Sequence, residues 1–180
     1  MTKYIAMLRG INVSGQKKIK MSDLALIMEK VGLKNVQTYI QSGNIIFDYK
    51  PANPEKIADI ISKCIKGKYE FDVPAIVITP SDIQNVIENN PWKDEDKKDT
   101  ERIYVTFLSA NPSRENLSKL STVQYDNEEF IINKNIVYFY AGSGYGRAKM
   151  NNNFFEKKLN VFATTRNWRT ILKLSDLSKL

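Results

Sequence analysis

Apolar residues in the first ninety positions follow two spacings, which predict short strands and amphipathic helices in alternation. Apolar runs predict strands at Tyr4–Leu8, Val36–Ile40, Ile45–Tyr49 and Val73–Thr79. Apolar residues at every third or fourth position predict helices at Ser22–Val31, from Pro54 onward, and at Ser81–Asn89. Ser22 and Ser81 suit the N-cap positions of their helices, and Gly32 suits the position after the first helix.

A charged segment separates these elements from a second, similar set. Residues 91–101 are rich in Lys, Asp and Glu and lack apolar periodicity, which predicts a connector. After it, the same spacings predict a strand at Ile103–Leu108, a helix at Ser113–Leu120, a hairpin of Phe130–Asn133 and Ile136–Tyr140 around Lys134, and helices at Phe154–Leu159 and Asn167–Leu180.

The two sets of elements predict an α+β protein made of two similar halves, residues 1–90 and 102–180. Tyr4 and Leu8 have the same spacing as Tyr104 and Leu108, which favours an internal duplication. We therefore expect two repeated ferredoxin-like (βαββα-type) halves with mainly antiparallel sheets and a C-terminal helix. A cleft between two such halves is the natural place for a ligand.

Composition excludes several kinds of chemistry. The 180 residues include no histidine and one cysteine, Cys64. Ser–His and Cys–His relays and the usual zinc sites are therefore excluded, as is an internal disulfide. Cys64 falls on the apolar side of the helix that starts at Pro54, which indicates a buried structural thiol. No apolar run is long enough to span a membrane and no leader is evident, so we expect a cytoplasmic protein without a membrane partner, metal or cofactor.

Positive charge is concentrated near the end of the chain. The stretch from Lys134 to Lys173 has eight basic residues against one acidic residue, Glu156, a net charge of +7 that equals the net charge of the whole protein. An anionic partner is therefore expected for this region. Two other acidic groups, Asp94–Asp99 and Glu128–Glu129, lie in polar surroundings and indicate solvated segments rather than a metal or acid–base site.

The segment Leu8–Val13 follows the first predicted strand and carries Arg9 and Asn12. Gly10 and Gly15 are spaced as in a phosphate-binding P-loop, but the next residue is Gln16 where a lysine is required, so the sequence does not predict a true P-loop. Two interpretations stay open: a mobile basic loop, or a looser loop that contacts an anion.

The segment Tyr39–Asn44 joins two predicted strands, with a two-residue hairpin turn at Ser42–Gly43. Turn formation alone can explain its polar residues. The alternative is that Gln41, Ser42 and Asn44 contact a base edge or a ligand amide.

Three glycines between Ala141 and Arg147 leave a loop whose main-chain N–H groups an anion can approach. Arg147 and Lys149 add charge beside it, and the asparagines at 151–153 can cap the following helix. A flexible connector is the alternative.

Thr164–Thr170 lies where the last predicted helix begins. Thr164 or Thr165 can cap this helix, and Arg166 and Asn167 would then lie near its N-terminal amides, where phosphate or carboxylate binds favourably. The segment is therefore either a structural cap or a ligand site.

Four of these strings together resemble a bacterial family of uncharacterised proteins, domain of unknown function 1697. They are Leu8–Val13, Tyr39–Asn44, Gly146–Lys149 and Thr164–Trp168, and they occur in the family's order along nearly the whole chain. Two positions depart from the family pattern, with Ala148 in place of Ser and Met150 in place of Leu. The resemblance implies an α+β fold of repeated ferredoxin-like elements and implies no activity.

The sequence favours an anion-binding protein whose ligand is a nucleotide, a phosphorylated metabolite or a short nucleic acid. The predicted ligand-binding residues are Arg9, Asn12, Gln41, Ser42, Asn44, Arg147, Lys149, Arg166 and Asn167. One alternative is a protein-interaction or structural module without a small ligand. The other is a histidine-free enzyme acting on a phosphorylated substrate, with Lys149 or Tyr145 handling the proton. The oligomeric state does not follow from the sequence.

Overall fold

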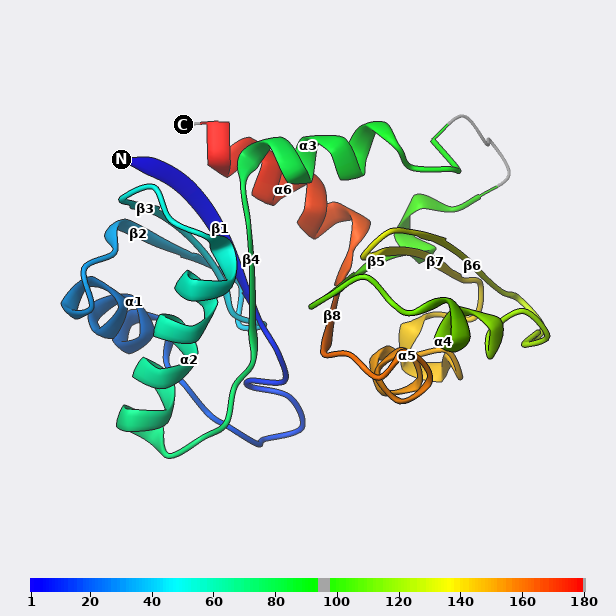
Figure 1. Cartoon of the computed structure of the whole chain (residues 1–180), viewed down its shortest axis with the longest axis horizontal. Coiled ribbons are helices and arrows are strands. Elements are labelled where there is room, and N and C mark those ends of the chain that lie inside the picture. The colour runs from blue at the N-terminus through cyan, green and yellow to red at the C-terminus, as the bar shows by residue number, and fades with distance from the viewer. Residues whose placement is uncertain (94–97, 180) are drawn as a thin grey trace. The chain divides into compact units, whose positions relative to one another are not determined.

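A computed structural model describes residues 1–93 and 98–179 (Figure 1). The chain divides into two compact units: unit 1, Met1–Gln84 with the end of the last helix from Lys173, and unit 2, Asn85–Leu172. Helices α3 (Pro80–Glu88) and α6 (Trp168–Lys179) each contain a boundary between the units. No helix in the described part of the chain is long and apolar enough to cross a membrane.

Unit 1 is a four-stranded antiparallel sheet covered by two helices. Its strands are β1 (Thr2–Leu8), β2 (Lys34–Tyr39), β3 (Asn44–Tyr49) and β4 (Ala75–Ile78), in the order β2-β3-β1-β4. The helices are α1 (Met21–Lys30) and α2 (Pro54–Tyr69). Alternate β1 residues Tyr4, Ala6 and Leu8 pack with the apolar stripes of both helices in one buried core, so the predicted amphipathic faces are confirmed.

Unit 2 is a second four-stranded antiparallel sheet. Its strands are β5 (Ile103–Leu108), β6 (Glu128–Asn133), β7 (Ile136–Ala141) and β8 (Ala163–Asn167), in the order β6-β7-β5-β8. Short helix α4 (Arg114–Ser118) and helix α5 (Asn152–Leu159) complete the unit, with 3₁₀ turns η1 (Thr100–Arg102) and η2 (Tyr145–Arg147). Its core gathers around Phe139 and Phe155, whose ring centroids are 6.0 Å apart.

The two sheets share one strand order. Strands β1–β4 and β5–β8 occupy equivalent places, and one helix lies between the first and second strands, and another between the third and fourth, of each set. The prediction of an α+β fold with antiparallel sheets and a C-terminal helix is therefore confirmed. The predicted connector at 91–101 lies partly outside the described residues, as do Asp94 and its neighbours up to residue 97.

Helix α2 starts at Pro54 as predicted, whereas the starts of α1 and α3 differ from the prediction. Helix α1 follows Lys20, so Ser22 lies inside its first turn, whereas Gly32 has the positive φ of +95° expected after the helix. Helix α3 starts at Pro80, whose fixed φ suits the first helical position, so Thr79 takes the place assigned to Ser81. The Thr79 hydroxyl accepts a hydrogen bond from the Asp82 N–H, and the Asp82 carboxylate accepts one from the Thr79 N–H.

Strand β8 was not predicted. Residues 163–167 pair with β5 along their whole length, and the β-branched Thr164 and Thr165 suit such a strand. The prediction that Thr164 or Thr165 caps the last helix is therefore wrong. Asn167 precedes α6 directly, and its Oδ1 accepts a hydrogen bond from the Thr170 N–H at 2.8 Å.

Tyr138 of β7 provides a test of packing inside unit 2. Its hydroxyl is buried and donates to the Val86 carbonyl at 2.9 Å, and burial raises its pKa from 10 to about 12. We expect Tyr138→Phe to lower the free energy of unfolding by about 1 kcal/mol at neutral pH.

Because the pKa of Tyr138 is higher in the folded state, its contribution is fully present below pH 10 and is lost as the pH rises toward about 12. Urea denaturation of both proteins across this range measures the difference. A gap between wild type and Tyr138→Phe that stays constant up to pH 12 would contradict the assignment.

Candidate functional site

The nine predicted ligand-binding residues form two groups, one in each unit. Arg9, Asn12, Gln41, Ser42 and Asn44 belong to unit 1, and Arg147, Lys149, Arg166 and Asn167 belong to unit 2. Each group is described by itself.

In unit 1 the loop after β1 and the loop between β2 and β3 are joined by the side chain of Asn12. Its Nδ2 donates to the main-chain oxygens of Gln41 at 2.9 Å and Ile19 at 3.0 Å, and its Oδ1 accepts from the Ile19 N–H at 2.9 Å. Asn12 has a φ of +54°, a conformation that asparagine tolerates better than most residues. The structure thus brings the motifs Leu8–Val13 and Tyr39–Asn44 together, and the Asn12 amide joins them by hydrogen bonds.

The turn between β2 and β3 is longer than predicted. Tyr39 pairs with Asn44, which leaves four residues from Ile40 to Gly43 in the turn. The buried Asn44 side chain donates to the Tyr39 carbonyl at 3.0 Å and to the Ser42 hydroxyl at 3.2 Å, so it closes the turn from inside. Gln41 has an exposed side chain. Turn formation therefore accounts for Ser42 and Asn44 without a ligand.

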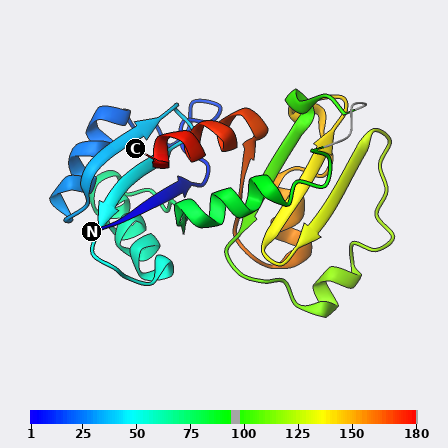
Figure 2. The same ribbon diagram turned by 90° about the horizontal axis from the view of Figure 1, so that it is seen from above.

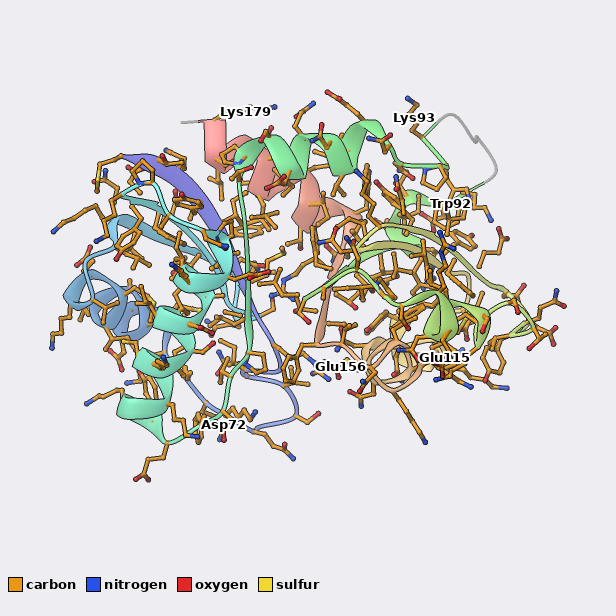
Figure 3. The ribbon with its side chains drawn as sticks, in the orientation of Figure 1. Asp72, Trp92, Lys93, Glu115, Glu156 and Lys179 are labelled. Atoms are coloured by element: carbon orange, nitrogen blue, oxygen red, sulfur yellow. The ribbon has the colours of Figure 1, made fainter. Side chains whose placement is uncertain are left out.

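Basic side chains lie in and beside the loop after β1. Lys17 has a φ of +45°, and its Nζ donates to the main-chain oxygen of Asp72 at 2.6 Å (Figure 3 labels Asp72). The Lys66 ammonium, 2.8 Å from the Asp72 carboxylate, lowers the pKa of that carboxyl, and the charge of Lys17 lowers it further. Arg9 is half-buried, and its N–H donates to the Pro74 carbonyl at 2.9 Å.

Gly43 lies where the two unit 1 loops are in contact. Its carbonyl accepts from the Leu8 N–H at 2.8 Å, its φ is +77°, and an added Cβ would lie 2.6 Å from Ile11 Cδ1 and 2.9 Å from Leu8 Cβ. Gly10 has a similar φ of +71° with nothing within 4 Å of an added Cβ.

Substitution by alanine should therefore lower the stability of the protein by different amounts at Gly43 and at Gly10. Gly10→Ala carries only the cost of a left-handed Ala, about 1 kcal/mol, whereas Gly43→Ala adds a steric clash worth about 2 kcal/mol more. Chemical denaturation of the two variants measures both values. Equal losses of stability would show that the two loops are not packed together at Gly43.

In unit 2 the glycine-rich loop after β7 is held by a carboxylate of its own chain. The Lys149 N–H donates to Glu128 Oε1 and the Met150 N–H to Glu128 Oε2, both at 2.8 Å. The prediction that Glu128 is merely solvated is therefore wrong. Since these positions are 21 and 22 residues from Glu128 in sequence, no local pattern could reveal the interaction.

The three glycines of the loop have different surroundings, and Gly142 packs against Asn127, whose carbonyl accepts its N–H at 2.8 Å. An added Cβ at Gly144, whose φ is +87°, would lie 2.6 Å from Arg102 Nη1, so the guanidinium packs on the loop, whereas nothing lies within 4 Å of such an atom at Gly146. Arg147 and Lys149 have exposed side chains, and the Lys149 Nζ lies 5.1 Å from the centroid of the Tyr125 ring.

Arg166 lies in strand β8, which ends directly before α6, and not at the capped helix start that the sequence predicted. Its side chain is buried, and Nη1 donates to Thr164 Oγ1 at 2.8 Å and to the Thr165 carbonyl at 2.9 Å. Burial lowers its pKa to about 10, and the charge of Tyr145 partly opposes this shift. Asn167 is exposed and caps α6, so the structural interpretation of this segment accounts for it.

A network of hydroxyl and amide groups joins the glycine-rich loop to the sheet. Asn152 donates its N–H to the Tyr145 hydroxyl at 2.9 Å, and its Oδ1 accepts from Thr165 Oγ1 at 3.0 Å. Thr165 is in turn 2.8 Å from Thr106 Oγ1 on β5. Sequence reasoning missed Thr106 and considered Asn152 only as a helix cap, because only strand β8, which it also missed, brings the two residues together. Among the described residues, no three Asp, Glu or Cys side chains gather where they could hold a metal ion.

Two of the four motifs, Leu8–Val13 and Tyr39–Asn44, lie within a family match. The model of the family described as "Protein of unknown function (DUF1697)" matches residues 1–138. The chain belongs to the DUF1697 family. Over the whole chain, this DUF1697 protein is also similar in fold to the conserved bacterial protein SP0830 from Streptococcus pneumoniae, with a TM-score of 0.79 and 22% sequence identity, covering 100% of this chain and 99% of the other. No curated protein matches the sequence.

Proposed function

We propose that this DUF1697 protein binds a phosphate-bearing anion at the glycine-rich loop of unit 2. The ligand class is a nucleotide, a phosphorylated metabolite or a short nucleic acid. The observation that carries the proposal is charge left without a counter-ion. Unit 2 exposes five basic side chains after residue 133, and none forms an ion pair within the described residues: Lys134, Arg147, Lys149, Lys157 and Arg169.

The loop geometry supports Arg147 as the centre of this site. The space around Gly146 is open, so a ligand can approach the main chain beside Arg147, whose planar guanidinium matches two phosphate oxygens at once. Because Glu128 is engaged by main-chain N–H groups, its carboxylate does not form an ion pair with the Lys149 ammonium. The loop of unit 1 supports the proposal less, since the amides of Asn12 and Asn44 are used within the turn.

A matched pair of arginine substitutions tests the proposal. Arg114 is also exposed, lies in α4 of unit 2 and forms no ion pair within the described residues, so Arg114→Ala removes the same charge away from the loop. We expect Arg147→Ala to weaken binding about tenfold and Arg114→Ala to change it less than about twofold, because a charge-assisted hydrogen bond is worth about 1.5 kcal/mol or more.

The measurements are thermal shift with inorganic phosphate, nucleoside mono- and triphosphates and sugar phosphates, and fluorescence anisotropy with a labelled single-stranded oligonucleotide. Binding that falls steeply with added salt indicates a nucleic-acid backbone, whereas a small bound phosphate loses less affinity. Equal effects of the two substitutions on affinity would show that binding depends on the overall surface charge and not on a site at the loop. Failure of every probe to bind would overturn the proposal.

We also propose that the two units are ferredoxin-like repeats. The shared strand order, the matching places of the helices and the equivalent positions of Tyr4 in β1 and Tyr104 in β5 support a duplicated βαββα unit. An experimental structure in which β1–β4 fail to superpose on β5–β8 would contradict the duplication.

A further inference from the structure

Strand β6 is a regular edge strand of unit 2, coloured yellow at the outer side of its sheet in Figure 2. Its six residues pair with β7 without any register shift. The edge strand β2 of unit 1 differs, because its register shifts between Lys34 and Gln37 and Asn35 adopts a positive φ. Bulges of that kind protect an edge from pairing with another chain, and β6 has none.

The main chain of β6 directs hydrogen-bonding groups away from its sheet. The Glu128 N–H donates to the Tyr125 carbonyl at 3.2 Å, on the side opposite β7. Since successive residues of an antiparallel strand direct these groups to alternate sides, the N–H and C=O of Phe130 and Ile132 also lie on the outer side. In the described residues, no segment outside β7 bonds to the main chain of either residue.

A groove lies along this edge. It has a volume of about 670 Å³ and is bordered by residues 123–126 and by β6, with Met150 also in its lining. Ile131, in the middle of β6, lines the groove and leaves 45% of its side chain exposed. An added strand could therefore form main-chain hydrogen bonds with β6 and an apolar contact with Ile131 at the same edge.

The charge of the groove indicates which strand it fits. Residues 123–131 contain Asp126, Glu128 and Glu129 and no basic residue, within a protein of net charge +7. Glu128 holds the glycine-rich loop and Glu129 pairs with Lys98, yet 59% of the Glu129 side chain stays exposed and Asp126 is exposed as well. A basic strand complements this surface, whereas an acidic one is repelled.

We propose that β6 accepts an extended segment of a partner protein, with alternating apolar and basic residues, as a fifth strand of the unit 2 sheet. The partner's main chain pairs with Phe130 and Ile132. Its apolar side chains contact Ile131, and its basic side chains approach Asp126 and Glu129.

The test uses the full chain and a labelled peptide of alternating valine and lysine, measured by fluorescence anisotropy. A second peptide of the same sequence carries N-methyl groups on its central residues, so it keeps every side chain and charge and loses the main-chain donors. We expect binding of the first peptide at concentrations below about 1 mM and at least about tenfold weaker binding of the N-methylated one. A valine–glutamate peptide should not bind.

Two protein variants locate the site. Ile131→Gln should weaken binding of the valine–lysine peptide about tenfold, whereas Leu172→Gln, at a residue with a similar exposure of 41%, should leave it within about twofold. Circular dichroism and thermal melting establish that both variants are folded.

Three results would overturn the proposal. Equal affinity for the N-methylated peptide would exclude main-chain pairing, and no binding of the valine–lysine peptide would exclude the basic strand. Sedimentation that shows a dimer of the wild type, dissociated by Ile131→Gln, would assign the edge to a second copy of this chain instead.

Discussion

The glycine-rich loop of unit 2 depends on one carboxylate. Glu128, at the start of β6, accepts the N–H groups of Lys149 and Met150 with one oxygen each. Hydrogen bonds to a charged group are worth about 1.5–3 kcal/mol, more than those between neutral groups. The second fixed point is Tyr145. Its ring centroid lies 4.9 Å from the ring centroid of Tyr104, and its hydroxyl accepts a hydrogen bond from the Asn152 N–H. Between these two points the N–H groups of Arg147 and Ala148 donate to the carbonyls of Gly144 and Tyr145, both at 3.1 Å, Ala148 is buried, and Gly146 is exposed.

Local sequence patterns predicted most elements because their causes are local. Strand β5 was predicted at its observed limits, and the apolar spacing of α2 corresponds to its buried residues Ile57, Ile61 and Ile65. The hairpin at Lys134 was predicted because its two strands adjoin in sequence. Strand β8 escaped prediction because its residues are mostly polar, and pairing with β5, about sixty residues earlier, decides its conformation.

The sequence identified the motifs of the candidate site but did not predict the contacts that most of their side chains make. The amide of Asn12 was a candidate ligand group, yet it bonds to Gln41, 29 residues away. Arg166 was placed beside a helix terminus, yet it lies buried in a strand. A polar side chain that the fold leaves without a hydrogen-bond partner is available to a ligand, and long-range pairing decides which side chains those are. Among the nine predicted residues, Arg147 has an exposed side chain and its ligand-binding role stays a prediction, whereas the amides of Asn12 and Asn44 form hydrogen bonds within the fold.

Unit 2 carries opposite charges on consecutive segments, and the fold keeps them from cancelling. Residues 123–131 are acidic, and the following segment from Lys134 to Lys149 is basic. Glu128 could have neutralised a basic side chain of the loop but bonds to main-chain N–H groups instead, while the Lys149 ammonium lies over the Tyr125 ring. A main-chain N–H carries no net charge, and the side chains of Arg147 and Lys149 are exposed to solvent without an ion-pair partner among the described residues. The same interaction fixes the start of β6 and the loop beside it, so an acidic strand edge and a basic loop persist within one unit.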